Sequence, residues 1–119
     1  MVVIGASPNP MRYSHKAVTE LLRKKYEVIP IGSREGFIGE AKIINGKPAL
    51  ENVDIVILYL NREKQREYYD YMLNLNPKKI LFNPGTETPE LVHIAYCNGI
   101  EILYDCALVL LYSNRVSCL

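Results

Sequence analysis

The segment 5–14, Gly-Ala-Ser-Pro-Asn-Pro-Met-Arg-Tyr-Ser, is the first part of this sequence whose residue types could bind a ligand. It lies between the apolar run 2–4 and a helical pattern, and this order exposes backbone N–H groups and the positive end of a helix dipole. Such an edge binds anions, and a pyrophosphate suits it. The alternative is an ordinary turn shaped by its glycine and prolines; the GxGxxG fingerprint is absent, since only Gly5 is present. The residues expected to line this anion site are Gly5, Ala6, Ser7, Pro8, Arg12, Tyr13, Ser14 and Lys16.

A second candidate site follows the β-rich segment 27–31. Proteins that bind NAD place an Asp or Glu here to hold the ribose 2′-hydroxyl. This chain instead has Ser33 and Arg34, and its first acid, Glu35, comes later. An arginine and a serine suit a phosphorylated ribose, either the 2′-phosphate of NADP or the 3′-phosphate of coenzyme A. The alternative is a solvated loop arginine. The residues assigned to this part of the site are Pro30, Ile31, Gly32, Ser33 and Arg34.

Two further loops follow apolar runs at 53–60 and 79–82. The carboxyl ends of parallel strands meet at one edge of a sheet, so these loops would line the same crevice as the first two. Either loop alone could be a simple turn. The residues assigned here are Tyr59, Leu60, Asn61, Asn83, Pro84 and Gly85.

Groups that could catalyse a reaction or hold a metal are few. Cys97, Cys106 and Cys118 share no CxxC spacing, and with His15 and His93 they form no recognisable set of metal ligands. We therefore expect free thiols in a reducing cytoplasm. Cys106 could be a reactive thiol and His15 a base, but a buried inert cysteine and a surface histidine are the simpler interpretations. No nucleophile, base and orienting group can be paired, so we expect no catalytic residues and no metal.

The elements that must position these loops alternate along the chain. Ser14, Asn61 and Thr88 are expected to cap helices, with Pro89 in the first helical position and Gly99 at a left-handed helix end. A hairpin turn is possible at 45–46, Asn-Gly, and the tail 107–119 could be helix or strand. The expected strands are 2–4, 27–31, 53–60, 79–82 and 100–104, and the expected helices are 14–25, 62–75 and 88–98.

Alternating strands and helices predict an α/β fold, a five-stranded parallel sheet with helices on both faces. We expect one Rossmann-like domain over residues 1–119 with strand order 3-2-1-4-5. The competing order is the flavodoxin-like 2-1-3-4-5, and the periodicity of apolar residues cannot distinguish the two orders.

Composition limits the partners of the protein. The 119 residues are 49% hydrophobic and 23% charged, typical of one globular domain. A net charge of +1 argues against non-specific binding to nucleic acid or to a membrane surface. No apolar run approaches the roughly 20 residues of a membrane span, and the N-terminus does not resemble a signal peptide, so we expect a cytoplasmic protein. The apolar tail segment 109–112 could support a homo-oligomer.

Taken together, these segments resemble the small CoA-binding proteins, stand-alone relatives of the CoA-binding domain of the succinyl-CoA synthetase α subunit. The resemblance extends over residues 2–107, although its loops at 31–32, 60–63 and 83–85 depart from the usual family pattern. The segments that carry it are Gly-Ala-Ser-Pro-Asn-Pro at 5–10 with Ser14 and Lys16, Tyr-Glu-Val-Ile-Pro at 26–30, Gly-Glu at 39–40, Val-Asp-Ile-Val at 53–56, Asn-Gly-Ile-Glu at 98–101 and Tyr-Asp-Cys at 104–106.

The resemblance implies a Rossmann-like fold that binds coenzyme A. It would place the pyrophosphate on residues 5–7 and the first helix, the adenosine beside Pro30 and 32–34, and the pantetheine arm past the loops at 59–61 and 83–85. The expected role is that of a module that binds coenzyme A or an acyl-CoA without catalysis, as a carrier, a sensor or the regulatory subunit of a partner enzyme. The alternatives are a small NADP-dependent oxidoreductase domain and an interaction domain without a ligand.

Overall fold

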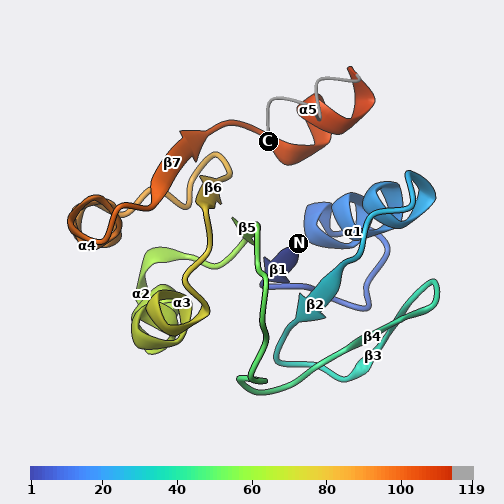
Figure 1. The fold of residues 1–119 in the computed structure, drawn as a ribbon. Coiled ribbons are helices and arrows are strands. Elements are labelled where there is room, and N and C mark those ends of the chain that lie inside the picture. Colours follow the sequence, from blue (N-terminus) through green and yellow to red (C-terminus); the bar gives the residue numbers. More distant parts are fainter. Residues whose placement is uncertain (114–119) are drawn as a thin grey trace.

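The computed structural model describes residues 1–113 and contains a five-stranded parallel sheet (Figure 1). All four pairs of neighbouring strands are parallel, and their spatial order is β2-β1-β5-β6-β7. The expected α/β class and the parallel sheet are therefore confirmed. Its strands are β1 (Val2–Ile4), β2 (Ile29–Ile31), β5 (Ile55–Leu58), β6 (Lys79–Phe82) and β7 (Glu101–Tyr104).

The strand order agrees with the expected Rossmann-like arrangement once the segment at Ile44 is included. Ile44 forms a parallel bridge with Ile31 on the outer side of β2; its N–H donates to the Pro30 carbonyl at 2.9 Å, and its own carbonyl accepts from Gly32 at 3.0 Å. If this segment is counted as the third strand along the chain, β5 and β6 become the fourth and fifth. The spatial order is then of the 3-2-1-4-5 type, with β7 added at the far edge. The five strands of the sheet counted alone run 2-1-3-4-5.

The expectation was therefore wrong about which segment fills the third place. The run 53–60 was expected there, but β5 lies on the other side of β1, in the middle of the sheet. All four residues of β5 are buried, which suits a strand covered on both faces better than an outer one.

Helices cover both faces of this sheet (Figure 1). One face carries α1 (Tyr13–Arg23) and α5 (Ala107–Tyr112), which share a core with alternate residues of the strands. The opposite face carries α3 (Tyr69–Leu75) and α4 (Pro89–Cys97). No helix within residues 1–113 is long and apolar enough to cross a membrane.

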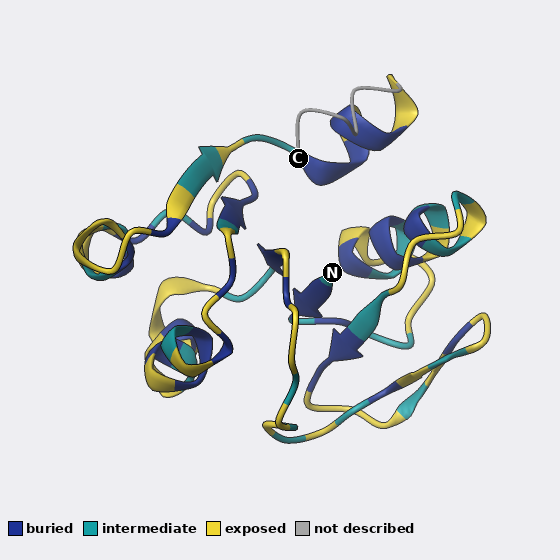
Figure 2. Ribbon diagram, viewed as in Figure 1, coloured by how far each residue is buried: buried dark blue, intermediate teal, exposed yellow. Residues whose placement is uncertain are grey.

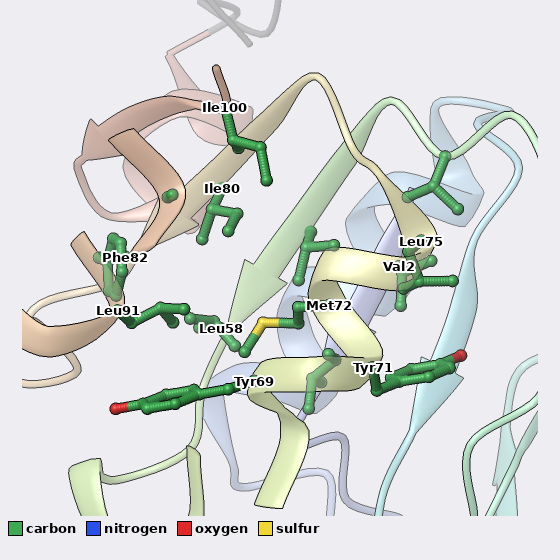
Figure 3. Packing of buried hydrophobic residues seen from close by; sticks show 14 of the residues in the cluster. Val2, Leu58, Tyr69, Tyr71, Met72, Leu75, Ile80, Phe82, Leu91 and Ile100 are labelled. Carbon is green, nitrogen blue, oxygen red and sulfur yellow. The ribbon is translucent and has the colours of Figure 1, made fainter. Parts of the chain in front are cut away.

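Buried side chains form one cluster on each face, and Figure 2 shows that β1 and β5 in the middle of the sheet are buried, whereas the edge strand β7 is partly exposed. On the face of α3 and α4, Met72 points toward Leu58 of β5, with Leu91 of α4 nearby (Figure 3). On the opposite face Val3 and Ile57 pack with Leu21 and other residues of α1 and α5. Because helices bury both faces of the sheet, the strands are held in place, and each loop at the carboxyl edge starts from a fixed strand end.

The helix expected over 62–75 is interrupted. It consists of α2 (Arg62–Gln65), a 3-10 turn η1 (Arg66–Tyr68) and α3. Gln65 is the only buried residue of α2, whereas α3 buries four of its seven residues against the sheet. The turn lets the two short helices present different sides to the core.

The hairpin lies earlier in the chain than expected. β3 (Gly36–Ile38) and β4 (Ala41–Ile43) pair antiparallel, and Gly39, with φ +58°, forms their turn. The predicted turn at 45–46 was wrong, because the chain at Ile44 continues alongside β2 instead of reversing. The left-handed helix end at Gly99 is confirmed by its φ of +71°. The tail forms α5 up to Tyr112, while Cys118 and the end of the predicted 1–119 domain lie outside the described residues.

Candidate functional site

The loops that follow β1 and β2 are held together by their backbones. The N–H groups of Gly5 and Ala6 both donate to the Ile31 carbonyl, at 2.8 and 2.9 Å. A Cβ on Gly32 would lie 2.1 Å from the Ala6 carbonyl oxygen, so no side chain fits there. The two loops therefore form one surface at the carboxyl edge of the sheet.

Gly5 also lets this surface meet the end of β5. Its φ is +99°, and a Cβ there would lie 2.9 Å from the carbonyl carbon of Tyr59. Only a glycine combines that backbone conformation with so close an approach. The chain runs from β1 to β2 on one side and from β5 to β6 on the other, so the connections after β1 and β5 diverge at this point, which is where α/β sheets bind their ligands.

The rest of the first loop is folded by local hydrogen bonds. The Ser7 hydroxyl accepts from the Asn9 N–H at 3.1 Å, and the Asn9 side-chain oxygen accepts from the Met11 N–H at 3.0 Å. His15 Nδ1 lies 3.0 Å from the Ser7 carbonyl oxygen and donates to it when protonated. His15, expected to be a surface residue, instead fastens the loop to α1, a contact that its sequence neighbours do not reveal.

The N-terminus of α1 faces this loop without a competing anion. Its N-cap residue is Arg12, no side chain caps it, and its first turn contains no acid. The prediction that Ser14 caps the helix was wrong, because Ser14 lies inside the first turn and is 4% exposed. The first N–H groups of a helix have no partner within it, so they remain available to a ligand. Arg12 is exposed, and Lys16 lies above the Tyr13 ring at 5.5 Å.

The loop after β2 divides into a buried and an exposed part. The side chains of Pro30 and Ile31 are buried, so these two residues face the edge only through their backbones. Ser33 and Arg34 are exposed at the end of the strand. A Cβ on Gly36 would lie 2.9 Å from the Pro8 side chain, so the β3–β4 hairpin closes against the first loop.

The loops after β5 and β6 use their amide side chains for structure. Asn61 caps α2, as expected, by accepting from the Lys64 N–H at 3.0 Å. Asn83 is 3% exposed; its Nδ2 donates to the Leu58 carbonyl and its Oδ1 accepts from the Ala107 N–H, both at 2.9 Å. The Asn83 side chain thus joins β5 to the start of α5. Pro84 and Gly85 are exposed beside it.

Gln65 is a structural residue of this edge that the sequence did not reveal. It is fully buried, and its Nε2 donates to the carbonyls of Leu60 at 2.9 Å and Thr86 at 2.6 Å. The Thr88 hydroxyl donates to its Oε1 at 2.8 Å, so Thr88 occupies the predicted N-cap position without capping α4 through its side chain. Nothing in the charged segment 62–67 marks one glutamine as buried.

Tyr59 and Cys106 lie on the α1 and α5 side of the same edge. The Tyr59 hydroxyl is buried without a hydrogen-bond partner in the described part of the chain. Burial raises the pKa of this phenol above its ordinary value, and the neighbouring Cys106 and Tyr112 add to the effect. Cys106 is a free, half-buried thiol that packs against the same core cluster, so it is less buried than expected.

The remaining candidate groups do not converge on the edge. His93 and Cys97 are exposed on α4, with Nε2 and Sγ 3.7 Å apart. Within residues 1–113 no three His, Cys, Asp or Glu side chains gather to hold a metal ion. The chemistry of the edge is that of backbone N–H groups with Arg12, Lys16 and Arg34 around them, a set that suits a phosphorylated nucleotide.

Comparison with known proteins identifies the family. The family model for the CoA binding domain matches residues 1–112. A solved structure described only as an uncharacterized protein is 42% identical, with a TM-score of 0.91, and the match covers 95% of this chain and 93% of that one.

More distant solved structures share the fold. One from Thermus thermophilus is 24% identical, with a TM-score of 0.82 over 95% of this chain and 87% of that one. A hypothetical protein from Pyrococcus horikoshii OT3 is 21% identical, with a TM-score of 0.82 over 95% and 80%. No protein with a curated functional description matches. Because the family model spans nearly the whole chain, the protein belongs to the CoA-binding domain family.

Proposed function

We propose that this protein binds coenzyme A across the carboxyl edge of its sheet and acts as a non-catalytic carrier, sensor or regulatory module. The observation that carries the proposal is the uncapped N-terminus of α1 beside the glycine turn at Gly5. The pyrophosphate lies over residues 5–7 and accepts from N–H groups of the first turn of α1. Arg12 and Lys16 balance its charge, and no carboxylate of that turn opposes it.

The adenosine end lies over the loop after β2. Arg34 and Ser33 are exposed there, free to contact the 3′-phosphate that distinguishes CoA from its dephospho form. Pro30, Ile31 and Gly32 support the adenosine end through the path of their backbone, because the two side chains are buried, Gly32 has no room for one, and the Pro30 and Ile31 carbonyls are already hydrogen-bonded within the protein.

The pantetheine arm runs toward the loops after β5 and β6. The Asn83 side chain already has two partners, so that loop offers the arm the exposed Pro84 and Gly85 instead. Tyr59 and Leu60 offer their half-buried surfaces, and Asn61 is exposed at the start of α2.

The groups at this edge support a binding role without catalysis. Backbone N–H groups and fixed cations bind and orient a phosphorylated ligand, but they do not activate a nucleophile. His15, the histidine nearest to the anion site, is directed at the Ser7 carbonyl instead of at a hydroxyl or thiol.

The test is isothermal titration of the wild-type protein and of Arg34→Ala with CoA and dephospho-CoA. The wild-type protein should bind CoA more tightly, and Arg34→Ala should weaken CoA binding about tenfold or more while leaving dephospho-CoA unchanged, because one charge-assisted contact is lost. Lys78→Ala is a matched control, since Lys78 is an exposed cation just before the amino end of β6. Equal weakening of both ligands by Arg34→Ala would refute the phosphate contact.

NADP is the second candidate ligand, because Ser33 and Arg34 would also suit its 2′-phosphate. The same titrations with NADP and NAD separate the two functions. Binding of NADP but not of CoA would replace the proposed function with that of an oxidoreductase domain. An absence of binding by all four compounds would favour an interaction domain without a ligand.

A further inference from the structure

A groove with a volume of about 480 Å³ lies between α4 and the edge strand β7. Its walls are formed by Val92, His93 and Tyr96 on α4 and by Ile102 and Tyr104 on β7. Residues four apart on a helix share one face, and so do residues two apart on a strand, so each wall is a continuous stripe. Figure 1 shows α4 lying alongside β7 at the end of the sheet.

The walls are mostly apolar, with His93 as their polar side chain, and they are open to solvent. Tyr96 is 81% exposed and Tyr104 is 57% exposed. The Tyr104 ring stacks on Phe82 of β6 with their centroids 5.7 Å apart, which holds this wall in place. Exposed aromatic side chains that line a hollow of this size are typical of a ligand site.

The mouth of the groove lies at the carboxyl edge of the sheet. Arg62, the first residue of α2, and Thr88, just before α4, line it, and they follow the same two strands whose loops are assigned to pantetheine. Three strand spacings separate β1 from β7, about 14 Å at about 4.8 Å each. An extended pantetheine arm that starts at the pyrophosphate covers such a span.

We propose that this groove takes the acyl chain of a medium-chain acyl-CoA, an inference that rests on the proposed binding of CoA. The thioester lies at the mouth near Arg62 and Thr88, and the chain runs down between α4 and β7. Apolar walls on both sides favour a hydrocarbon chain over a polar acyl group, because burial of methylenes is the main gain that such walls offer.

The experiment is titration of CoA, acetyl-CoA and octanoyl-CoA into the whole protein. A fully buried methylene strengthens binding about fourfold, and one that is half covered in an open groove about twofold. Octanoyl-CoA should therefore bind about 60-fold more tightly than acetyl-CoA, since it has about six more methylenes. Equal affinity for the two thioesters would overturn the proposal.

Val92→Asp should reduce this chain-length effect to less than about fivefold, because a carboxylate then lies on one wall. Tyr96→Asp should do the same, and its 81% exposure makes misfolding no concern. Both variants should bind unacylated CoA as the wild type does, which also reports on their folding. Val109→Asp introduces the same change on the exposed side of α5, outside the groove, and should keep the full effect.

The outcomes separate this inference from the proposed function. If CoA itself does not bind, both fail. If CoA binds and chain length has no effect, only the acyl groove fails. If sedimentation shows a dimer that Val92→Asp dissociates while acyl-CoA affinity is unchanged, a second copy covers the groove and the acyl proposal is wrong.

Discussion

Single residues at the carboxyl edge divide into those that shape the site and those that could touch a ligand. Gly5, Gly32 and Gln65 shape it, because each allows or holds a close contact between loops. Asn83 was expected to contact the cofactor, but its buried side chain holds the loop after β6 in place. Arg12, Lys16 and Arg34 remain the side chains best suited to phosphate.

Gly5→Ala tests the close approach of the first loop to β5. The change places a Cβ 2.9 Å from Tyr59 in a conformation with φ +99°, so we expect a loss of about 1–3 kcal/mol in the free energy of unfolding. Gly99→Ala is the control for backbone strain alone, because Gly99 has φ +71° and no atom within 4 Å of the added Cβ. Urea unfolding measures the free energy of unfolding of both variants. An equal decrease in the two would show that the contact with Tyr59 has no cost.

Tyr59→Phe tests the unpartnered hydroxyl. Burial raises the Tyr59 pKa, so above about pH 10, the ordinary tyrosine value, the unfolded chain releases this proton before the folded protein does. The folded state is then disfavoured, and its stability falls as the pH rises. Tyr59→Phe should make this fall shallower, and at pH 7 it should leave stability unchanged or higher, because a buried hydroxyl without a partner is removed.

Denaturant unfolding from pH 7 to pH 11 measures the effect of Tyr59→Phe. Burial also raises the pKa of Tyr68, Tyr69 and Tyr71, so part of the alkaline loss should remain. Tyr96→Phe, at an exposed position, is the control. A loss of more than about 1 kcal/mol at pH 7 in Tyr59→Phe would show that the hydroxyl has a partner in solution.

Among the elements, α5 is a short helix that depends on its neighbours. It has six residues, too few for a helix that is stable alone; four of them are buried, and three of these belong to the cluster shared with α1. Leu111→Ala should therefore lower the free energy of unfolding by about 2–4 kcal/mol, because Leu111 is 1% exposed. Val109→Ala, at a position 48% exposed, should cost less than about 0.5 kcal/mol. Thermal unfolding compares the two; similar small losses would mean that α5 does not pack on α1 in solution.

The elements also differ in how well their ends could be predicted. β6 has the expected bounds, and the α4 start at Pro89 matches the Thr-Pro signal. The interrupted helix at 62–75 and the early hairpin at 36–43 were not expected. In both places the outcome depends on which face of the segment meets the core, and local periodicity does not contain that information.

At the scale of the whole molecule, the topology sets the place of the site. The chain leaves β1 toward β2 and leaves β5 toward β6, so the connections that follow these two neighbouring strands diverge at the carboxyl edge, beside the first loop and the start of α1. The proposed acyl groove lies at the far end of the same edge, between α4 and β7. One ligand laid along the edge would thus meet cations and N–H groups first and apolar walls last.

The sequence by itself determined the α/β class, the parallel sheet, the five segments that form its strands, and the glycine turn that opens the first loop. These follow from local hydrophobic periodicity and from residues such as Gly5, Pro89 and Gly99, whose effect is on their own backbone. The tertiary structure alone decided that β5 occupies the centre of the sheet, that Asn83 and Gln65 are buried supports, and that α4 and β7 enclose a groove. These depend on contacts between residues far apart in the chain, and such contacts form only when whole apolar faces are buried together.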